Sequence, residues 1–313
     1  MSTVNQNIAL PIVADILSVS KATLLKWERS EKLIPISTSE NGQRHYSVEQ
    51  LLQFPQVEKM QKSLLEVELA EKPLRRYSSI ELFAGAGGLA LGMEKAGFEP
   101  VMLNEIEKSA CDTLKRNRPV WNIIHDDVKN ISFQDYAGRV DLLAGGFPCQ
   151  AFSYAGQKRG FEDTRGTLFF EFAQALRVIQ PKVFLAENVR GLLKHDNGKT
   201  LQTIINTAEE IGYHIIEPKV LKAILYKVPQ KRERLFIIGI RKDLYKGLSF
   251  SWPSPHSRIM TVRDALKAGV LYGSDVPQSK GQLYPKRKKE ILSNVPQGGY
   301  WRDLPDVLQR EYM

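Results

Sequence analysis

Short apolar runs alternate with stretches of helical apolar spacing through the middle of the chain. Apolar runs bounded by turn residues predict strands, and apolar residues that recur with the period of a helix predict helices. The predicted strands span residues 78–83, 101–104, 140–144, 182–186, 220–225 and 235–240. The predicted helices between them span residues 89–96, 168–179 and 200–211. Such alternation predicts an α/β fold with a doubly wound, mostly parallel sheet.

The first part of the chain has a different pattern and predicts a small, separate helical unit. Its predicted elements are a helix at 10–17, a second helix at 21–31 capped by Ser20, a hairpin turning at Asn41-Gly42, and a third helix opened by a capping box from Ser47 to Gln50. This order resembles the winged helix-turn-helix head of the MerR family. The alternative is a structural or dimerising helical cap.

The resemblance to a winged head implies a DNA-facing set of residues. On the second helix these are Lys21, Thr23, Lys26 and Arg29, and on the wing they are Arg44 and His45. Residues 56–77, which follow this head at 1–55, are charged and predict a helical linker that ends near Lys72-Pro73.

A glycine-rich turn, Ala84 to Gly88, stands between the first predicted strand of the α/β part and its helix. Such a turn lets backbone N–H groups and a helix N-terminus approach a ligand. Glu105 follows about 20 residues later, at the end of the next strand, where an acid can hold ribose hydroxyls. Asp127 comes after a further short strand and can accept a hydrogen bond from a purine amine. Each of these features alone is equally consistent with an ordinary turn.

Three further sets of candidate residues carry reactive or charged groups. Cys149 follows Gly146, Phe147 and Pro148 in a loop after a buried strand, and a cysteine there is a nucleophile if its thiolate is stabilised. A lone cysteine is more often a small buried apolar side chain. Glu187 ends its own strand, and strand ends converge at one crevice in this architecture. Arg232 and Arg234 alternate, so both point to the same face of an extended segment.

Taken together and in this order, the motifs between residues 80 and 240 resemble those of the DNA cytosine-C5 methyltransferase family. The matching segments are 83–88, 104–105, Asp127, 146–150, 163–169, 187–189 and 230–234. The resemblance implies a methyltransferase fold with S-adenosylmethionine as cofactor and S-adenosylhomocysteine as product. It implies that double-stranded DNA is the partner, that the target cytosine is flipped out of the duplex, and that the enzyme serves restriction-modification.

The resemblance also assigns residues to roles. The implied catalytic residues are Cys149, Glu187, Arg232 and Arg234. Cys149 would attack C6 of the cytosine, and Glu187 would hold a proton at N3. Arg232 would bind O2, and Arg234 would hold the neighbouring residues of the site in place. The implied cofactor-binding residues are Phe83, Gly85, Ala86, Gly87, Gly88, Glu105, Ile106, Asp127, Gly146 and Pro148. The implied DNA contacts of this domain are Gln150, Ser153 and Arg165. No spacing of His, Cys, Asp and Glu indicates a metal site.

The composition of the chain adds little to the functional prediction. The chain has 313 residues, a formal net charge of +9 and two cysteines. The positive charge is compatible with a polyanionic partner, and so few cysteines fit a reducing cytoplasm, so a cytoplasmic, nucleoid-associated protein is expected. No apolar run approaches the length of a membrane span.

Two departures from the family pattern bear on activity. Glu81 stands where the family usually has Asp. The methyltransferase part, 78–250, is followed at 251–313 by what resembles only the start of a target-recognition region. The chain is therefore expected to be either a cut form of a longer protein or the large subunit of a split enzyme with a second polypeptide, and weak or no methylation by this chain alone is predicted. The alternatives are a DNA-binding transcriptional regulator without independent catalysis and a tRNA cytosine-C5 methyltransferase.

Overall fold

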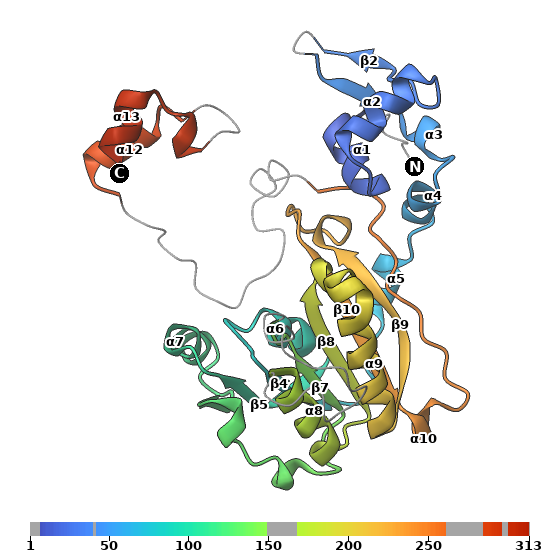
Figure 1. The fold of residues 1–313 in the computed structure, drawn as a ribbon, viewed down its shortest axis with the longest axis vertical. Coiled ribbons are helices and arrows are strands. Elements are labelled where there is room, and N and C mark those ends of the chain that lie inside the picture. Colours follow the sequence, from blue (N-terminus) through green and yellow to red (C-terminus); the bar gives the residue numbers. More distant parts are fainter. Residues whose placement is uncertain (1–6, 40–41, 149–167, 261–283, 296–299, 313) are drawn as a thin grey trace. The chain divides into compact units, whose positions relative to one another are not determined.

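The computed structural model describes residues 7–39, 42–148, 168–260, 284–295 and 300–312 (Figure 1). The chain divides into two compact units, Met1–Gly269 and Val270–Met313. In the described part of the second unit, α12 (Lys286–Leu292) and α13 (Asp306–Tyr312) are joined by an ion pair between Arg287 and Glu311. No helix among the described residues is long and apolar enough to cross a membrane.

The first unit contains a seven-stranded sheet with the order β6-β5-β4-β7-β8-β10-β9. Its strands are β4 (Tyr77–Leu82), β5 (Phe98–Glu105), β6 (Ile123–His125), β7 (Leu142–Gly145), β8 (Val183–Val189), β9 (Tyr213–Lys222) and β10 (Glu233–Arg241). Strands β4 to β8 pair in parallel, whereas β10 is antiparallel to both β8 and β9. The prediction of a mostly parallel α/β sheet is therefore confirmed.

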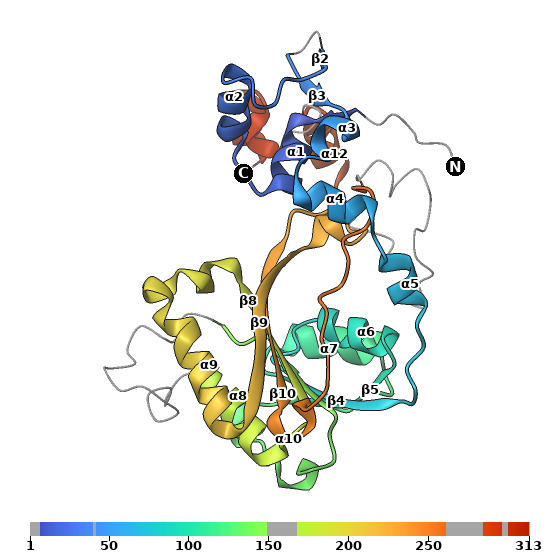
Figure 2. The same cartoon turned by 90° about the vertical axis from the view of Figure 1, so that its right-hand side faces the viewer.

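Helices cover both faces of this sheet (Figure 2). They are α6 (Gly88–Lys95) and α7 (Lys108–Asn117) on one face, and α8 (Leu168–Ile179) and α9 (Lys199–Ile211) on the other. Alternate residues of a strand point to opposite faces, so each layer receives its own core. One core gathers Ile80 and Phe172, and the other gathers Leu103 and Leu114. Burial of each such side chain contributes about 1.5–3 kcal/mol.

The predicted strand at 220–225 is wrong in its limits. Strand β9 begins at Tyr213, directly after Gly212 ends α9 with a φ of 118°, and residues Ala223–Leu225 form a short 3-10 helix. Among the described residues, β9 pairs only with β10. It is therefore an edge strand and tolerates polar residues and Pro218, which lies at an irregularity in the pairing. Its apolar pattern is therefore too weak to mark the strand from the sequence.

The N-terminal head has the predicted order of elements. These are α1 (Leu10–Leu17), α2 (Lys21–Arg29), β2 (Ser37–Thr38), β3 (Arg44–Tyr46) and α3 (Val48–Leu51). The Ser20 side chain accepts a hydrogen bond from the backbone N–H of Thr23, and both bonds of the capping box between Ser47 and Gln50 are present. The hairpin is confirmed, although Asn41 of its turn lies outside the described residues.

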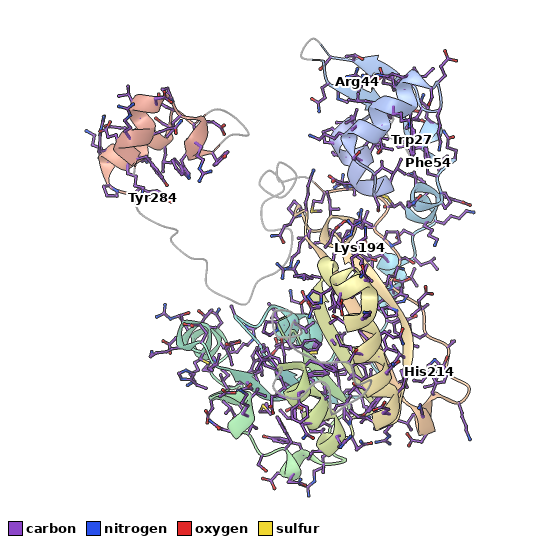
Figure 3. All side chains as sticks on the ribbon, in the orientation of Figure 1. Trp27, Arg44, Phe54, Lys194, His214 and Tyr284 are labelled. Atoms are coloured by element: carbon purple, nitrogen blue, oxygen red, sulfur yellow. The ribbon has the colours of Figure 1, made fainter. Side chains whose placement is uncertain are left out.

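Two features of the head were not predicted from the sequence. Strand β1 (Ile8–Ala9) pairs with β3 and makes the hairpin a three-stranded sheet. The rings of Trp27 and Phe54 stack with their centroids 5.4 Å apart, which joins α2 to the segment after α3 (Figure 3). Because Phe54 directly precedes α4 (Pro55–Gln61), this stack holds the start of α4 against α2.

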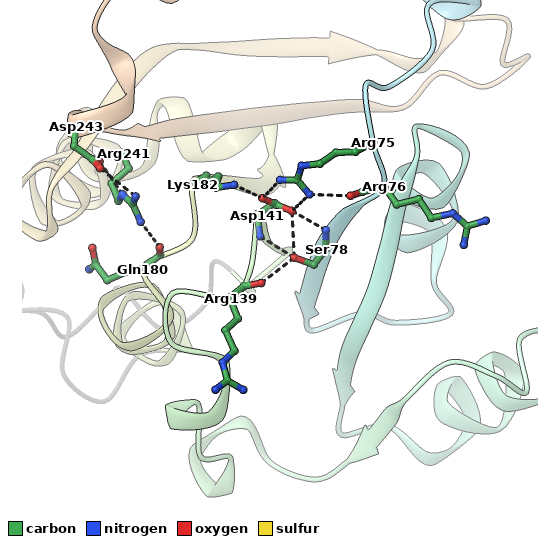
Figure 4. Close-up of polar contacts among 9 residues, drawn as sticks. All are labelled: Arg75, Arg76, Ser78, Arg139, Asp141, Gln180, Lys182, Arg241 and Asp243. Carbon is green, nitrogen blue, oxygen red and sulfur yellow. Dashed lines mark hydrogen bonds and ion pairs between the residues drawn. The ribbon is translucent and has the colours of Figure 1, made fainter.

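The linker is helical in two pieces, α4 (Pro55–Gln61) and α5 (Leu65–Ala70), as predicted. Its last residues meet the sheet through Asp141, which lies just before β7 (Figure 4). The guanidinium of Arg75 donates to both Asp141 oxygens at 2.6 and 3.0 Å, and Lys182 forms an ion pair with Asp141 at 2.8 Å. This cluster fixes the linker at the N-terminal ends of the parallel strands. The candidate chemistry lies at their opposite, carboxyl ends.

Candidate active site

A cavity of about 560 Å³ lies at the carboxyl ends of the parallel strands. Its lining residues in the described part of the chain are Glu81, Phe83, Ala84, Gly88, Leu89, Gly146, Glu187, Leu221, Ala223, Tyr226, Arg232, Arg234 and Phe236. This is the edge at which an open α/β sheet binds its ligands. The predicted groups from β4, β7, β8 and the start of β10 therefore share one cavity.

The glycine-rich turn forms one wall of this cavity. Phe83 has a φ of 60°, an uncommon conformation for a residue with a side chain, and Gly85 and Gly87 have φ values of 54° and 84°. A Cβ at position 87 would lie 2.4 Å from Cδ2 of Leu114, so this overlap and the positive φ both favour glycine. The tight turn places Gly88 at the first turn of α6, where backbone N–H groups are free of helical partners.

Glu105 holds the turn in place. Its Oε2 accepts a hydrogen bond from the backbone N–H of Gly85 at 2.7 Å, and its Oε1 accepts from Ile106 and Glu107 at 2.9 and 2.8 Å. Three of the acceptor positions of this carboxylate are thus used by the backbone, which leaves capacity for a further donor. Glu105 has a supporting role in the free protein that the sequence did not indicate.

Asp127 lies beyond β6, the edge strand on this side of the sheet. Its side chain accepts a hydrogen bond from the backbone N–H of Lys129 at 3.1 Å and caps a short 3-10 helix. Ile106, predicted to contact the cofactor, is 64% exposed at the end of β5. Ile106 and Asp127 therefore follow adjacent strands, β5 and β6, beside the glycine turn.

Glu187 faces two guanidinium groups across the cavity. The Nε of Arg234 lies 2.8 Å from Glu187 Oε1, and an Nη of Arg232 lies 3.7 Å from the same oxygen. The other oxygen, Oε2, faces Gly146, where an added Cβ would lie 3.4 Å away. Arg232 and Arg234, which were predicted to point to the same face of an extended segment, thus both direct their guanidinium groups at Glu187.

Asn188 is a positioning residue to which the sequence assigned no role. The side-chain Nδ2 of Asn188 donates to the backbone carbonyl of Phe147 at 2.8 Å. The side-chain Oδ1 accepts from the backbone N–H of Val189 at 2.9 Å. The ring of Phe147 is buried against Phe169 and Phe172. Asn188 therefore fixes the backbone two residues before Cys149.

Several predicted residues stand at or beyond the end of the described segment 42–148. Pro148 is exposed and is the last described residue before the gap, and Cys149, Gln150, Ser153 and Arg165 lie outside the described residues. Their assigned roles stay predictions.

The predicted DNA-facing residues of the head divide into two groups. Lys21, Lys26 and Arg29 are exposed on α2. The Thr23 hydroxyl instead lies 2.8 Å from the Ser20 hydroxyl, and Arg44 forms an ion pair with Glu28 of α2 at 2.6 Å. The wing is thereby tied to α2, and three exposed cations remain on the helix surface.

The family model described as "C-5 cytosine-specific DNA methylase" matches residues 77–306, and that described as "MerR HTH family regulatory protein" matches residues 12–76. The chain is similar to Type II methyltransferase M.Eco47II of Escherichia coli, with 57% identity over 100% of this chain and 75% of that protein. It is also 58% identical to Type II methyltransferase M.PspPI of Psychrobacter sp. (strain TA137), over 96% of this chain and 73% of that protein.

Among solved structures, the fold is similar to that of a DNA modification methyltransferase encoded within an E. coli prophage. The TM-score is 0.52 and the identity is 28%, over 74% of this chain and 67% of that chain.

Proposed function

Because the chain belongs to the C-5 cytosine-specific DNA methylase family, we propose that it transfers a methyl group from S-adenosylmethionine to carbon 5 of a cytosine in duplex DNA. The contact between Glu187 and Arg234, inside the cavity that the glycine-rich turn borders, is the observation that carries this proposal. The relatives are named Type II methyltransferases, which supports a place in restriction-modification.

The residues of the cavity fit the cofactor. The first turn of α6 offers backbone N–H groups to a carboxylate, and the carboxyl of Glu81 offers a buried oxygen without a partner among the described residues. Glu105 is the last residue of β5, and Asp127 follows the adjacent strand β6; they would hold the ribose and the adenine, respectively. When bound, S-adenosylmethionine supplies an electrophilic methyl group at its sulfonium.

The chain's own residues would activate the cytosine. The Cys149 thiolate adds to C6, which makes C5 nucleophilic. Glu187 would hold a proton at N3, with its Oε2 turned toward Gly146 and its Oε1 paired with Arg234. Arg232, which is farther from Glu187 and about half exposed, would bind the pyrimidine O2. After methyl transfer, a base removes the C5 proton and the thiol is eliminated.

Trapping on 5-fluorocytosine tests this proposal, because fluorine at C5 blocks the final elimination. Trapping needs only one turnover, so the weak methylation predicted for this chain alone is compatible with it. We expect a covalent adduct to accumulate on a 5-fluorocytosine duplex with S-adenosylmethionine, and no adduct with Cys149→Ala. An adduct on tRNA but not on the duplex would favour the tRNA alternative. Absence of any adduct together with intact duplex binding would favour a regulator without independent catalysis.

The head supports a second proposed function, which is binding to a DNA site separate from the methylated one. The match to the MerR family and the exposed cations of α2 favour it. Loss of methylation in Cys149→Ala with unchanged binding to a promoter fragment would separate the two functions.

The relatives extend over more residues than this chain matches, and the comparisons do not support a second polypeptide. We also propose that the chain divides at the segment limits 1–55, 56–77, 78–250 and 251–313, and that the protein associates with the nucleoid.

A further inference from the structure

The connection between β9 and β10, residues 223–232, forms one wall of the active-site cavity. Its residues Ala223, Tyr226 and Arg232 line that cavity. The two ends of the connection are joined by a hydrogen bond from the backbone N–H of Ala223 to the carbonyl of Arg232 at 2.9 Å. The position of Arg232, which the proposed reaction assigns to the pyrimidine O2, therefore depends on the contacts that hold this connection.

The N-terminal head contacts the start of the connection through α1. The backbone carbonyl of Asp15, in the last turn of α1, accepts a hydrogen bond from Nζ of Lys222 at 2.7 Å. Carbonyls in the last turn of a helix lack helical partners and form the negative end of the helix dipole, so they attract an ammonium group. Leu225 of the connection packs against the apolar core of the head. The head and the wall of the active site are thus in direct contact.

The side chain of Asp15 makes a second contact, next to Arg232. Its Oδ2 lies 2.7 Å from Nζ of Lys231, the residue that precedes Arg232. This oxygen is buried and accepts no hydrogen bond from the described residues, so the ion pair with Lys231 is what compensates its burial. Arg232 and Arg234 line a second cavity of about 510 Å³ together with Asp15 and Lys231, and they also line the active-site cavity with Glu187. The two arginines therefore stand between the head residue and the proposed chemistry.

The linker after the head supports the same wall at a greater distance from Arg232. Glu66 of α5 forms an ion pair with Lys227 in the middle of the connection. Lys231, by contrast, is bonded directly to Arg232 along the chain. Of these two ion pairs, the one between Asp15 and Lys231 has the more direct influence on the Arg232 side chain.

We propose that Asp15 is a positioning residue, whose ion pair with Lys231 places Arg232 for the methyl transfer, so that the head supports catalysis directly. This inference rests on the proposed function, because Asp15 acts through Arg232. A small displacement of a group that binds the reacting base lowers the rate even when the changed residue lies far from the base. The head would then be part of the methyltransferase in addition to any DNA site that it binds by itself.

The variant Asp15→Asn tests this role, because it removes the charge and keeps both the side-chain shape and the backbone carbonyl. We expect it to slow adduct formation on a saturating 5-fluorocytosine duplex by about fivefold, which is what a partly exposed ion pair can contribute. Affinity for S-adenosylhomocysteine should be unchanged, and Asp15→Glu should recover part of the rate. Glu58→Gln is the matched control, since it removes the acid of an exposed pair with Lys62 in α4, and its rate should equal that of the wild type.

A double-mutant cycle identifies the route of the effect. If Asp15 acts through Lys231, Asp15→Asn should cause no further loss of rate in a Lys231→Gln background. Additive losses from the two substitutions would overturn the proposal, and so would a wild-type rate in Asp15→Asn.

Hydrogen exchange of the full chain separates positioning from the proposed function. In Asp15→Asn, amides of residues 223–232 should exchange faster than in the wild type, whereas those of residues 10–17 should not change. Faster exchange confined to residues 10–17 would show that Asp15 only stabilises the head and would contradict the proposal. If the wild type forms no adduct, the proposed function fails, but faster exchange at 223–232 would still support the contact and unchanged exchange would exclude it.

Discussion

Arg234 is the second residue of the antiparallel strand β10 and places its Nε 2.8 Å from Oε1 of Glu187 on the neighbouring β8. In the pairing of these strands, Arg234 lies opposite Val189 and Phe236 lies opposite Glu187. The side chains of Arg234 and Glu187 are 25% and 23% exposed, respectively, so the pair is partly shielded from water. Arg234 therefore fixes the carboxyl that is proposed to hold the proton of the target base.

Replacing Arg234 should impair the chemistry more than it impairs DNA binding. We expect Arg234→Ala to lower kcat by about 100-fold, because the Glu187 carboxyl loses its orienting partner. Arg234→Lys should recover part of this loss, since an ammonium restores the charge but not the planar geometry. Single-turnover methylation of a duplex measures the effect. A fall in duplex affinity with unchanged kcat would contradict this role.

Asn188 should help to position the loop that carries Cys149 without touching the reacting atoms. We expect Asn188→Ala to slow adduct formation on a 5-fluorocytosine duplex by about tenfold or more, because the Phe147 carbonyl loses its hydrogen bond and the loop loses its fixed start. Cofactor affinity should be unchanged. Adduct formation at the wild-type rate would show that Phe147 is held well enough by its aromatic neighbours.

Asp141 should stabilise the fold in a pH-dependent way. Burial raises the pKa of this carboxyl, but hydrogen bonds from Arg75 and Lys182 more than offset it, so the pKa lies well below its usual range. A depressed pKa stabilises the folded state above the unfolded value of about 4, and this contribution is lost as the pH falls below it.

The variant Asp141→Asn keeps the shape of the side chain and removes its charge. It should lower the free energy of unfolding by about 1–3 kcal/mol near pH 7. The difference from the wild type should shrink below about pH 4. Urea unfolding at pH 7 and pH 3.5 measures both values, and a constant difference would rule out the ion pairs as its source.

The exposed cations of α2 should contribute to head binding through phosphates. We expect Lys26→Ala and Arg29→Ala each to weaken promoter binding and to reduce the slope of log K against log salt by about 1. Glu31→Ala, on the exposed segment after α2, is a matched control that removes a charge of the opposite sign and should not reduce the slope. Unchanged slopes in both cation variants would favour the alternative of a structural cap.

Much of the fold and of the site could be predicted from the sequence. The order of strands and helices, the caps at Ser20 and Ser47, and the glycine turn were all local features, since each depends on residues a few positions apart. The edge strand β9 was not predictable, because its polar residues and Pro218 are tolerated only where a strand has one neighbour. Helix α8 was predicted correctly, because one of its faces is buried and its apolar residues therefore recur with the period of a helix.

The amino-acid sequence by itself determined which chemical groups the protein possesses, from the glycine turn to the acid at Glu187 and the paired arginines. Only the tertiary structure decided where they meet. The reversed direction of β10 brings its N-terminal end to the carboxyl ends of the parallel strands, so Arg234 reaches Glu187. Burial beneath α6 likewise leaves Glu81 with a carboxyl oxygen that has no hydrogen-bond partner in the part of the chain that the structure describes. Strand direction and desolvation depend on contacts between distant segments, which a local pattern does not specify.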